Sequence, residues 1–210
     1  MESYSEEVLL AIQQHALLSL YCVLIASALG VLIGVASYRR AWSSNLTIST
    51  SAVAFTIPSI AALGMTLSLF GETLTAVMPV IVMYGLLPIV RNTVVGLQSV
   101  DASMLDAARG MGVARFRMLW QIELPSAWPV ILAGIRVSAQ LTVGVVVIAA
   151  FVLSGFGLGG FAFDALNNLG SANTANAAWA ATVFTVAIAL IFDLVFVIIR
   201  RYTIPRGIRV

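Results

Sequence analysis

Five long apolar stretches constrain what this chain can fold into more than any other feature. They run approximately over residues 16–37, 47–70, 74–97, 129–153 and 178–199. A hydrocarbon core of about 30 Å needs about 20 apolar residues in a helix, so each stretch is long enough to cross a membrane. Backbone polar groups in lipid must pair within their own segment, and the alternating pattern of a membrane β-barrel is missing, so all five are predicted to be helices.

The composition agrees with an all-α integral membrane protein. Of the 210 residues, 60% are hydrophobic and 10% are charged. Residues 1–210 are therefore predicted to form a single transmembrane domain, and the longest stretch outside the spans, 98–128, is too short to bury its own core. The net charge of +2 forms no water-facing basic patch, so lipid rather than nucleic acid is the expected surrounding partner.

The arginines alternate between successive connections and thereby predict an orientation. Nine of the eleven arginines lie in segments 38–46 and 98–128 or after residue 199, whereas the N-terminal segment and connections 71–73 and 154–177 carry none. Arginine is retained on the cytoplasmic side of a membrane. The N-terminus is therefore predicted to lie outside, and segment 98–128 and the C-terminus in the cytoplasm.

Missing residue types exclude several kinds of chemistry. The chain has no lysine, so it offers neither a P-loop lysine nor a Schiff-base amine. The single histidine, His15, is expected at the membrane interface, and with Cys22 as the only cysteine no metal site is predicted. The chain is not expected to be an enzyme, since an intramembrane active site would need a nucleophile with a base or a set of metal ligands.

Segment 98–128 has the pattern of two short helices that need a partner. Ser103 followed by Asp106 is a capping-box pattern, Gly110 permits a bend, and Pro125 with Pro129 is expected to end the second helix before the fourth span begins. Apolar residues and arginines then share one surface. These are Met104, Leu105, Met111, Phe116, Leu119 and Trp120 beside Arg109, Arg115 and Arg117. Such a surface indicates a partner protein or the membrane interface.

A spaced motif lies within this segment. Its residues are Asp106, Ala107 and Ala108, then Gly112, then Ile122, Leu124 and Pro125. This motif resembles the EAA loop of the permease subunits of bacterial ABC importers, with Asp106 where the family usually has glutamate. The resemblance implies a type I permease fold of about five spans, in which these seven residues couple the chain to a separate ATPase subunit.

Further runs extend the resemblance over most of the chain. Residues 55–59, 84–93, 110–112, 129–136 and 155–161 are similar to the permeases of osmoprotectant importers, which carry glycine betaine, choline, carnitine and related quaternary amines. The resemblance implies a multi-pass subunit of the bacterial cytoplasmic (inner) membrane that moves such a solute by alternating access. The implied partners are two ATPase subunits, a second permease that is a copy or a paralogue, and an extracytoplasmic solute-binding protein. ATP and Mg would bind the ATPase partner, and this chain would bind no cofactor.

Three ionisable residues lie within the predicted spans: Arg91, Arg136 and Asp193. At about 1.5 Å per residue, each lies roughly 10 Å from the predicted cytoplasmic end of its helix. Asp193 is therefore predicted to pair with Arg136 or Arg91 near the inner mouth of the pathway. The alternative is that the two arginines snorkel separately and that Asp193 faces water.

Prolines and aromatic residues suggest where a pathway could run. Pro58 interrupts the second span, and Pro79 and Pro88 the third, as kinks that serve packing or shape the pathway. Phe55 and Tyr84 are candidate pathway residues because quaternary ammonium groups favour aromatic faces, and Pro58 is a candidate because its kink could shape the pathway. Simple packing of these aromatic rings is the alternative.

Two other functions stay open. One is an ABC permease for methionine or another amino acid, which would differ in the binding protein that stimulates its ATPase. The other is a stand-alone secondary carrier or channel, which usually shows inverted repeats and buried ion-coordinating carboxylates. The chain shows no such repeat and has one acidic residue deep in a span.

Overall fold

The computed structural model describes residues 2–153, 156–170 and 174–204, and this part of the chain is helical without strands. The all-α prediction is therefore confirmed for these residues. The helices are α1 (Glu2–Ser37), α2 (Ala41–Thr56), α3 (Ser59–Phe70), α4 (Leu74–Gln98), α5 (Ala102–Gly110), α6 (Arg115–Met118), a π-helical turn η1 (Leu119–Glu123), α7 (Leu124–Val152), α8 (Gly157–Asn167) and α9 (Thr174–Thr203).

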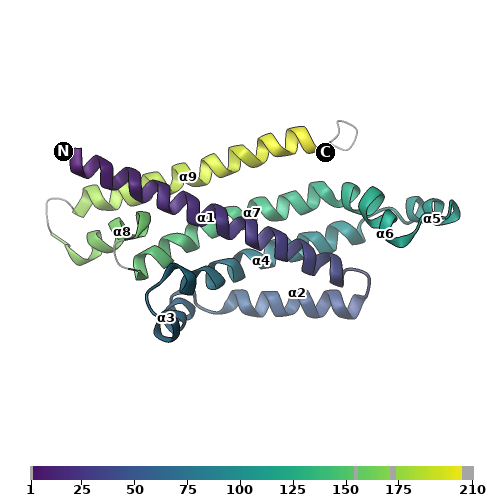
Figure 1. The fold of residues 1–210 in the computed structure, drawn as a ribbon, viewed down its shortest axis with the longest axis horizontal. Helices are drawn as coiled ribbons and strands as arrows, with labels where there is room; N and C mark the ends of the chain where they lie inside the picture. Colours follow the sequence, from purple (N-terminus) through teal and green to yellow (C-terminus); the bar gives the residue numbers. More distant parts are fainter. Residues whose placement is uncertain (1, 154–155, 171–173, 205–210) are drawn as a thin grey trace.

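Three long helices, α1, α4 and α7, form the centre of the bundle and contact one another. Helices α2 and α3 lie on one side of this centre and α9 lies on the opposite side (Figure 1). The α1–α2 turn, α5 and α6 lie toward one end, called here the loop end, and the start of α1 and α8 lie toward the other, the α8 end (Figure 1).

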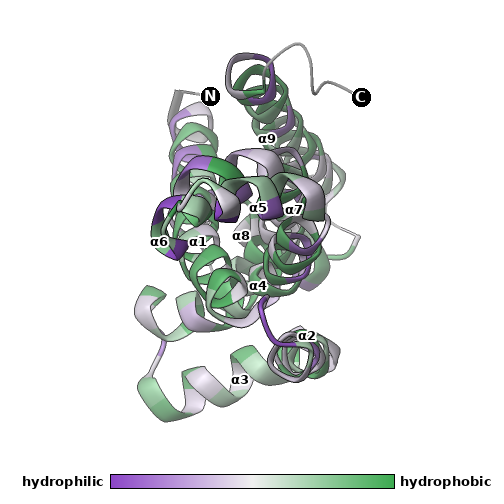
Figure 2. Cartoon of the chain, turned by 90° about the vertical axis from the view of Figure 1, so that its right-hand side faces the viewer, coloured by the Kyte–Doolittle hydropathy of each residue, from purple (hydrophilic) through white to green (hydrophobic). Residues whose placement is uncertain are grey.

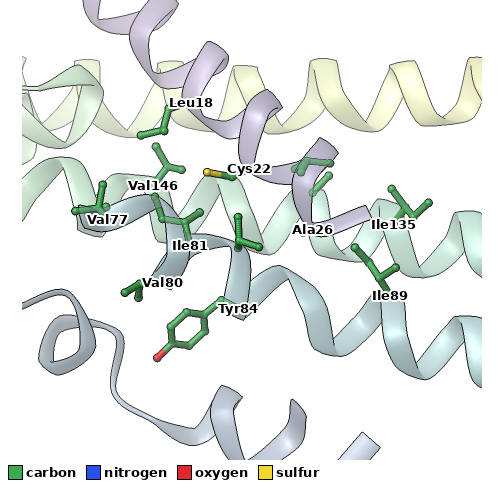
Figure 3. Close-up of a cluster of buried hydrophobic side chains, with 14 of the residues drawn as sticks. Leu18, Cys22, Ala26, Val77, Val80, Ile81, Tyr84, Ile89, Ile135 and Val146 are labelled. Carbon is green, nitrogen blue, oxygen red and sulfur yellow. The ribbon is translucent and has the colours of Figure 1, made fainter. Parts of the chain in front are cut away.

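Apolar side chains of α1, α4 and α7 fill the space between these helices. The close-up in Figure 3 shows them pointing toward one another from the three helices, and the sulfur of Cys22 lies among them. The buried residues drawn there include Leu18, Cys22 and Ala26 of α1, Val77, Val80, Ile81 and Ile89 of α4, and Ile135 and Val146 of α7.

Glycines allow these helices to approach closely. Gly30 and Gly34 lie one turn apart on α1, and a Cβ atom added at Gly34 would lie 2.6 Å from Thr93 of α4. On α7, a Cβ atom at Gly134 would lie 2.6 Å from the Cβ atom of Asn92. Small residues at such contacts are what lets membrane helices gain van der Waals packing, so these glycines hold α4 between α1 and α7.

The predicted second span is two helices rather than one. Helices α2 and α3 meet at an angle of 84°. Proline disfavours helical geometry at the residue before it, and Ile57 is extended, with φ −64° and ψ 128°. The Tyr84 hydroxyl donates a hydrogen bond to the carbonyl oxygen of Ile57, which satisfies an acceptor at the break. By contrast, Pro79 and Pro88 lie inside α4 without ending it.

Among the described residues, four helices or continuous helical stretches are long and apolar enough to cross a membrane, and five if the bent pair counts as one span. The third and fifth predicted spans agree closely with α4 and α9. The first does not, because α1 begins at Glu2 instead of Ala16. The fourth does not either, because the helix runs from Arg115 to Val152.

The early start of the fourth span corrects the prediction that prolines end the preceding helix. Pro125 lies directly after the π-helical turn in a helical stretch that continues from Arg115 to Val152, so this proline does not end the helix. Pro129 lies inside the helix. A membrane helix can accommodate a proline when the freed backbone carbonyl finds another hydrogen-bond partner through a local change in helical geometry. Segment 98–128 is therefore a loop only as far as residue 114.

His15 is buried between helices, and its expected position at the membrane interface stays a prediction. Its side chain is fully buried, and Nε2 lies 3.2 Å from the carbonyl oxygen of Val143 on α7. The length of α1 places His15 well inside the helix, opposite α7 and next to Gly157 of α8.

Charged residues separate between the two ends of the bundle. The α1–α2 turn, α5, α6 and the end of α9 carry Arg39, Arg40, Arg109, Arg115, Arg117, Arg200 and Arg201. Toward the α8 end, the described charged residues are acidic, namely Glu6, Glu7, Glu72 and Asp164. Figure 2 views the loop end and shows hydrophilic residues on α5 and α6, in contrast to the largely hydrophobic α9 and α1.

Candidate functional site

Helix α5 begins at a cap different from the one that the sequence suggests. The carboxylate of Asp101 accepts a hydrogen bond of 2.8 Å from the backbone N–H of Ser103. This hydrogen bond lowers the pKa of Asp101 below its usual value. Ser103 is thus the second residue of the helix and Asp101 is the N-cap, because an aspartate there satisfies an otherwise free N–H of the first turn.

The first half of the motif lies on α5. Asp106 is exposed, and its carboxylate forms an ion pair of 2.8 Å with Arg109 one turn later. Ala107 is exposed and Ala108 is buried, so the helix presents Asp106 and Ala107 outward. Gly112 follows with φ +77°, a left-handed conformation that favours glycine and ends the helix there.

The second half of the motif lies on the fourth span. Ile122 belongs to the π-helical turn, and Leu124 and Pro125 begin α7. Leu124 packs against the main hydrophobic core. The motif therefore joins an exposed helix to a turn that is anchored in the bundle.

Large apolar side chains are exposed at the loop end, on and after α5, and the described residues do not bury them. Met111 is 76% exposed and Phe116 is 74% exposed, and the rings of Phe116 and Trp120 lie 6.1 Å apart. With Met104, Asp106, Met111, Phe116 and Trp120, this region is called here the docking surface. An exposed apolar patch with charged neighbours is typical of a site of protein association.

A polar cluster at the base of the docking surface was missed by sequence reasoning. The Tyr38 hydroxyl donates a hydrogen bond of 2.5 Å to Oε2 of Glu123, and Nε of Arg39 donates one of 2.6 Å to the same hydroxyl. Nη2 of Arg39 also lies 3.4 Å from Glu123. Burial and, after it, the hydrogen bond to Glu123 raise the pKa of Tyr38, and the hydrogen bond to Tyr38 raises the pKa of Arg39.

One sequence signal could have indicated this cluster. Tyr38 and Arg39 directly follow the first span, and Glu123 lies inside the motif between Ile122 and Leu124. All three lie on the side predicted to be cytoplasmic. An acidic residue among apolar motif residues needs a positive or hydrogen-bonding partner, and Arg39 and Tyr38 are candidates on that side.

A second polar cluster joins α7 and α9 within the apolar part of the bundle. Nε and Nη2 of Arg136 donate hydrogen bonds of 2.6 and 2.7 Å to the two carboxylate oxygens of Asp193. Nε2 of Gln140 donates a third, of 2.9 Å, to Asp193. Of the two pairings that the sequence allowed for Asp193, the structure contains the one with Arg136. Arg91 is exposed on α4, and no described residue forms an ion pair with it.

A cavity of about 670 Å³ lies beside this cluster. Its lining combines Arg136, Gln140 and Arg200 with apolar residues such as Leu132 and Phe196. The ion pair thus borders a space that is large enough for a small solute or a lipid chain.

The three candidate pathway residues meet at the α2–α3 bend. The rings of Phe55 and Tyr84 contact edge to face, with centroids 5.6 Å apart. Tyr84 is buried, and its hydroxyl points away from the α1 and α7 side, toward α2 and α3 (Figure 3). Pro58 is the N-cap of α3. In this chain the two rings pack the bend, and their role as pathway residues stays a prediction.

Within the described ranges, no group of three or more histidine, cysteine, aspartate or glutamate side chains is placed to hold a metal ion. The described residues form an exposed apolar surface with Asp106 at the loop end, a polar cluster at its base and an ion pair between α7 and α9.

Comparison with known proteins identifies the class to which this architecture belongs. Residues 26–204 match the family described as the inner membrane component of binding-protein-dependent transport systems. Because this match covers most of the chain, the chain belongs to that family. It is therefore a multi-pass membrane permease subunit of the ABC importer type, and a transport subunit.

Particular relatives narrow the comparison further. The chain is 36% identical over 155 residues to the carnitine transport permease protein OpuCB of Listeria monocytogenes, covering 73% of this chain and 70% of the relative. It is 33% identical to the glycine betaine/carnitine/choline transport system permease protein OpuCD of Bacillus subtilis, over 87% of this chain and 78% of the relative. It is 32% identical to the osmoprotectant import permease protein OsmW of Salmonella typhimurium, over 93% and 91%.

A solved structure supports the fold. The chain superposes on a chain of the MetNI methionine ABC transporter, crystallised in an inward-facing conformation, with a TM-score of 0.81. The match covers 97% of this chain and 99% of the other at 16% identity. The predicted permease fold is therefore confirmed.

Proposed function

We propose that this chain forms the translocation pathway of an importer for a compatible solute such as glycine betaine, choline or carnitine. The observation that carries the solute class is the similarity to relatives named for these solutes, each 32–36% identical over at least 73% of the chain. The methionine transporter matches at 16% identity, and this likeness concerns the fold.

The exposed docking surface supports the proposed ATPase partners. Two ATPase subunits dock on α5 and its surroundings in a pair of permeases, and an extracytoplasmic binding protein delivers the solute at the α8 end. ATP and Mg bind the ATPase subunits, and this chain has no ATPase site of its own. Closure of the ATPases draws the two α5 helices together and opens the pathway outward; hydrolysis returns it to the inward-facing state.

The exposed carboxylate of Asp106 makes the docking proposal testable. In the complex co-expressed with its ATPase, D106R reverses the charge of an exposed residue of the docking surface and is expected to abolish co-purification of the ATPase. The matched control is D164R, which reverses an exposed aspartate of α8 at the opposite end. Equal recovery of the ATPase with both variants would contradict docking at α5.

The solute class needs a second measurement. In lipid, ATP hydrolysis by the wild-type complex is expected to rise with binding protein loaded with glycine betaine, choline or carnitine. Stimulation by methionine or another amino acid alone would leave the permease function standing and overturn the osmoprotectant assignment.

A further inference from the structure

Tyr38 makes two hydrogen bonds to residues at opposite ends of the docking segment, residues 99–122. Its backbone carbonyl oxygen accepts a hydrogen bond of 2.9 Å from Nε2 of Gln98, the last residue of α4. Its hydroxyl donates to Glu123, at the end of the π-helical turn. One residue of the α1–α2 turn therefore touches the chain immediately before and immediately after the segment that carries the docking surface.

The hydrogen bond between Tyr38 and Glu123 lies in a protected environment. Tyr38 is 7% exposed and Glu123 is 5% exposed. Gln98 also lies 3.4 Å from the hydroxyl of Ser44, a buried residue in the first turn of α2. A hydrogen bond to a charged group is stronger than one between neutral groups, and losing it would leave the Glu123 carboxylate buried with only Arg39, at 3.4 Å.

We infer that Tyr38 is a positioning residue that links movement of the docking segment to α2. This inference rests on the proposed function, in which the ATPase displaces α5. Since both ends of the segment are bonded to Tyr38, a displacement of the segment that moves Gln98 or Glu123 is passed to the α1–α2 turn.

The neighbouring elements suit this role. Turns of π-helix are often found at functional sites, and η1 places Glu123 directly beside Tyr38. At the far end of α2, Tyr84 bonds the carbonyl of Ile57, so the bend between α2 and α3 is tied to α4. A continuous set of contacts thus runs from the docking segment through α2 to the bend.

The experiment compares Y38F with Y21F in the complete complex, reconstituted in vesicles with its ATPase subunits and binding protein. Tyr21 lies on α1 and is exposed. ATP hydrolysis and solute uptake are measured in the same vesicles. Y38F is expected to hydrolyse ATP at the wild-type rate or faster while uptake per ATP falls several-fold, and Y21F is expected to keep the wild-type ratio.

The conservative variant E123Q separates the hydroxyl contact from a general loss of structure. Its amide oxygen still accepts from Tyr38, so E123Q is expected to keep a higher ratio of uptake to hydrolysis than Y38F. An unchanged ratio in Y38F, or a parallel fall of hydrolysis and uptake, would overturn the inference.

If Y38F does not assemble, Gln98→Leu removes the other bond to Tyr38 and must lower the same ratio; a wild-type ratio would then overturn the inference. A wild-type chain that recovers no ATPase would remove the proposed function and this inference together. Coupled wild-type transport with an unchanged ratio in Y38F would remove this inference alone.

Discussion

At the scale of single residues, Arg136 and Asp193 form an ion pair between two of the helices that are long and apolar enough to cross a membrane. An ionised side chain within a membrane is costly unless a partner compensates its charge. The two parallel hydrogen bonds from Arg136, with the third from Gln140, provide that compensation. The pair joins α7 to α9, a helix that has few buried side chains.

Removing one charge of this ion pair should destabilise the complex more than removing both charges. D193N leaves the guanidinium of Arg136 without a carboxylate and is expected to lower the yield and the thermal midpoint of the complex in detergent. The double variant R136Q/D193N should recover much of the loss, because neither charge then remains. The control is Arg91→Gln, which removes an arginine that has no ion pair with the described residues. Additive losses in the double variant would contradict the pairing.

The residue scale also shows what spacing could and could not predict. The matching depths of Arg136 and Asp193 along their helices indicated that they could pair. The choice of Arg136 over Arg91 depended on which faces of α7 and α9 meet. That choice is a property of helix packing, so it could not be predicted from spacing.

At the scale of helices, the contact between α4 and α7 depends on missing side chains. A Cβ atom at Gly134 would meet Asn92 and the carbonyl oxygen of Pro88, the latter at 2.8 Å. By contrast, a Cβ atom at Gly144 on the same helix would meet nothing within 4 Å.

Substitution of the two glycines should therefore have opposite effects. Gly134→Ala is expected to lower the free energy of unfolding by about 1–3 kcal/mol, as overpacking does in tightly packed interiors. Gly144→Ala should be neutral or slightly stabilising, because alanine favours the helix. Thermal unfolding in detergent measures both, and an equal loss of stability in the two variants would contradict the close contact at Gly134.

Helix bounds were predictable where local pattern decides them. Helix α4 begins at the predicted residue, Leu74. The polar residues Glu72 and Thr73 precede it, and the Thr73 hydroxyl caps the helix by accepting a hydrogen bond from the N–H of Ala76. The sequence predicted an interruption of the second span at Pro58, but it did not predict the angle between α2 and α3. That angle depends on Tyr84, which is distant in sequence and holds the Ile57 carbonyl.

At the scale of the whole molecule, the arginines of three segments that are separate in sequence lie together at the loop end, because successive long helices run in opposite directions. The orientation in the membrane remains a prediction from this distribution. It places α5 in the cytoplasm and α8 outside.

Cysteine labelling tests this orientation. Cys22 is fully buried, so a membrane-impermeant maleimide is expected to leave the wild-type chain unlabelled. On intact cells, Asn167→Cys at the end of α8 should be labelled, and Ser103→Cys on α5 should be labelled only after the membrane is permeabilised. Both positions are exposed. The reverse pattern would show the opposite orientation.

The sequence alone determined the class of this protein and its spans to within a few residues in two cases, and it predicted the segment that is proposed to meet a partner. Hydropathy, arginine placement and motif spacing are local properties, and the membrane limits the structures that can satisfy the backbone. Only the tertiary structure decided that α2 and α3 bend apart, that Arg136 is the partner of Asp193, and that Tyr38 meets both Gln98 and Glu123. The physical reason is that each contact joins residues distant in sequence, and helix packing sets their positions.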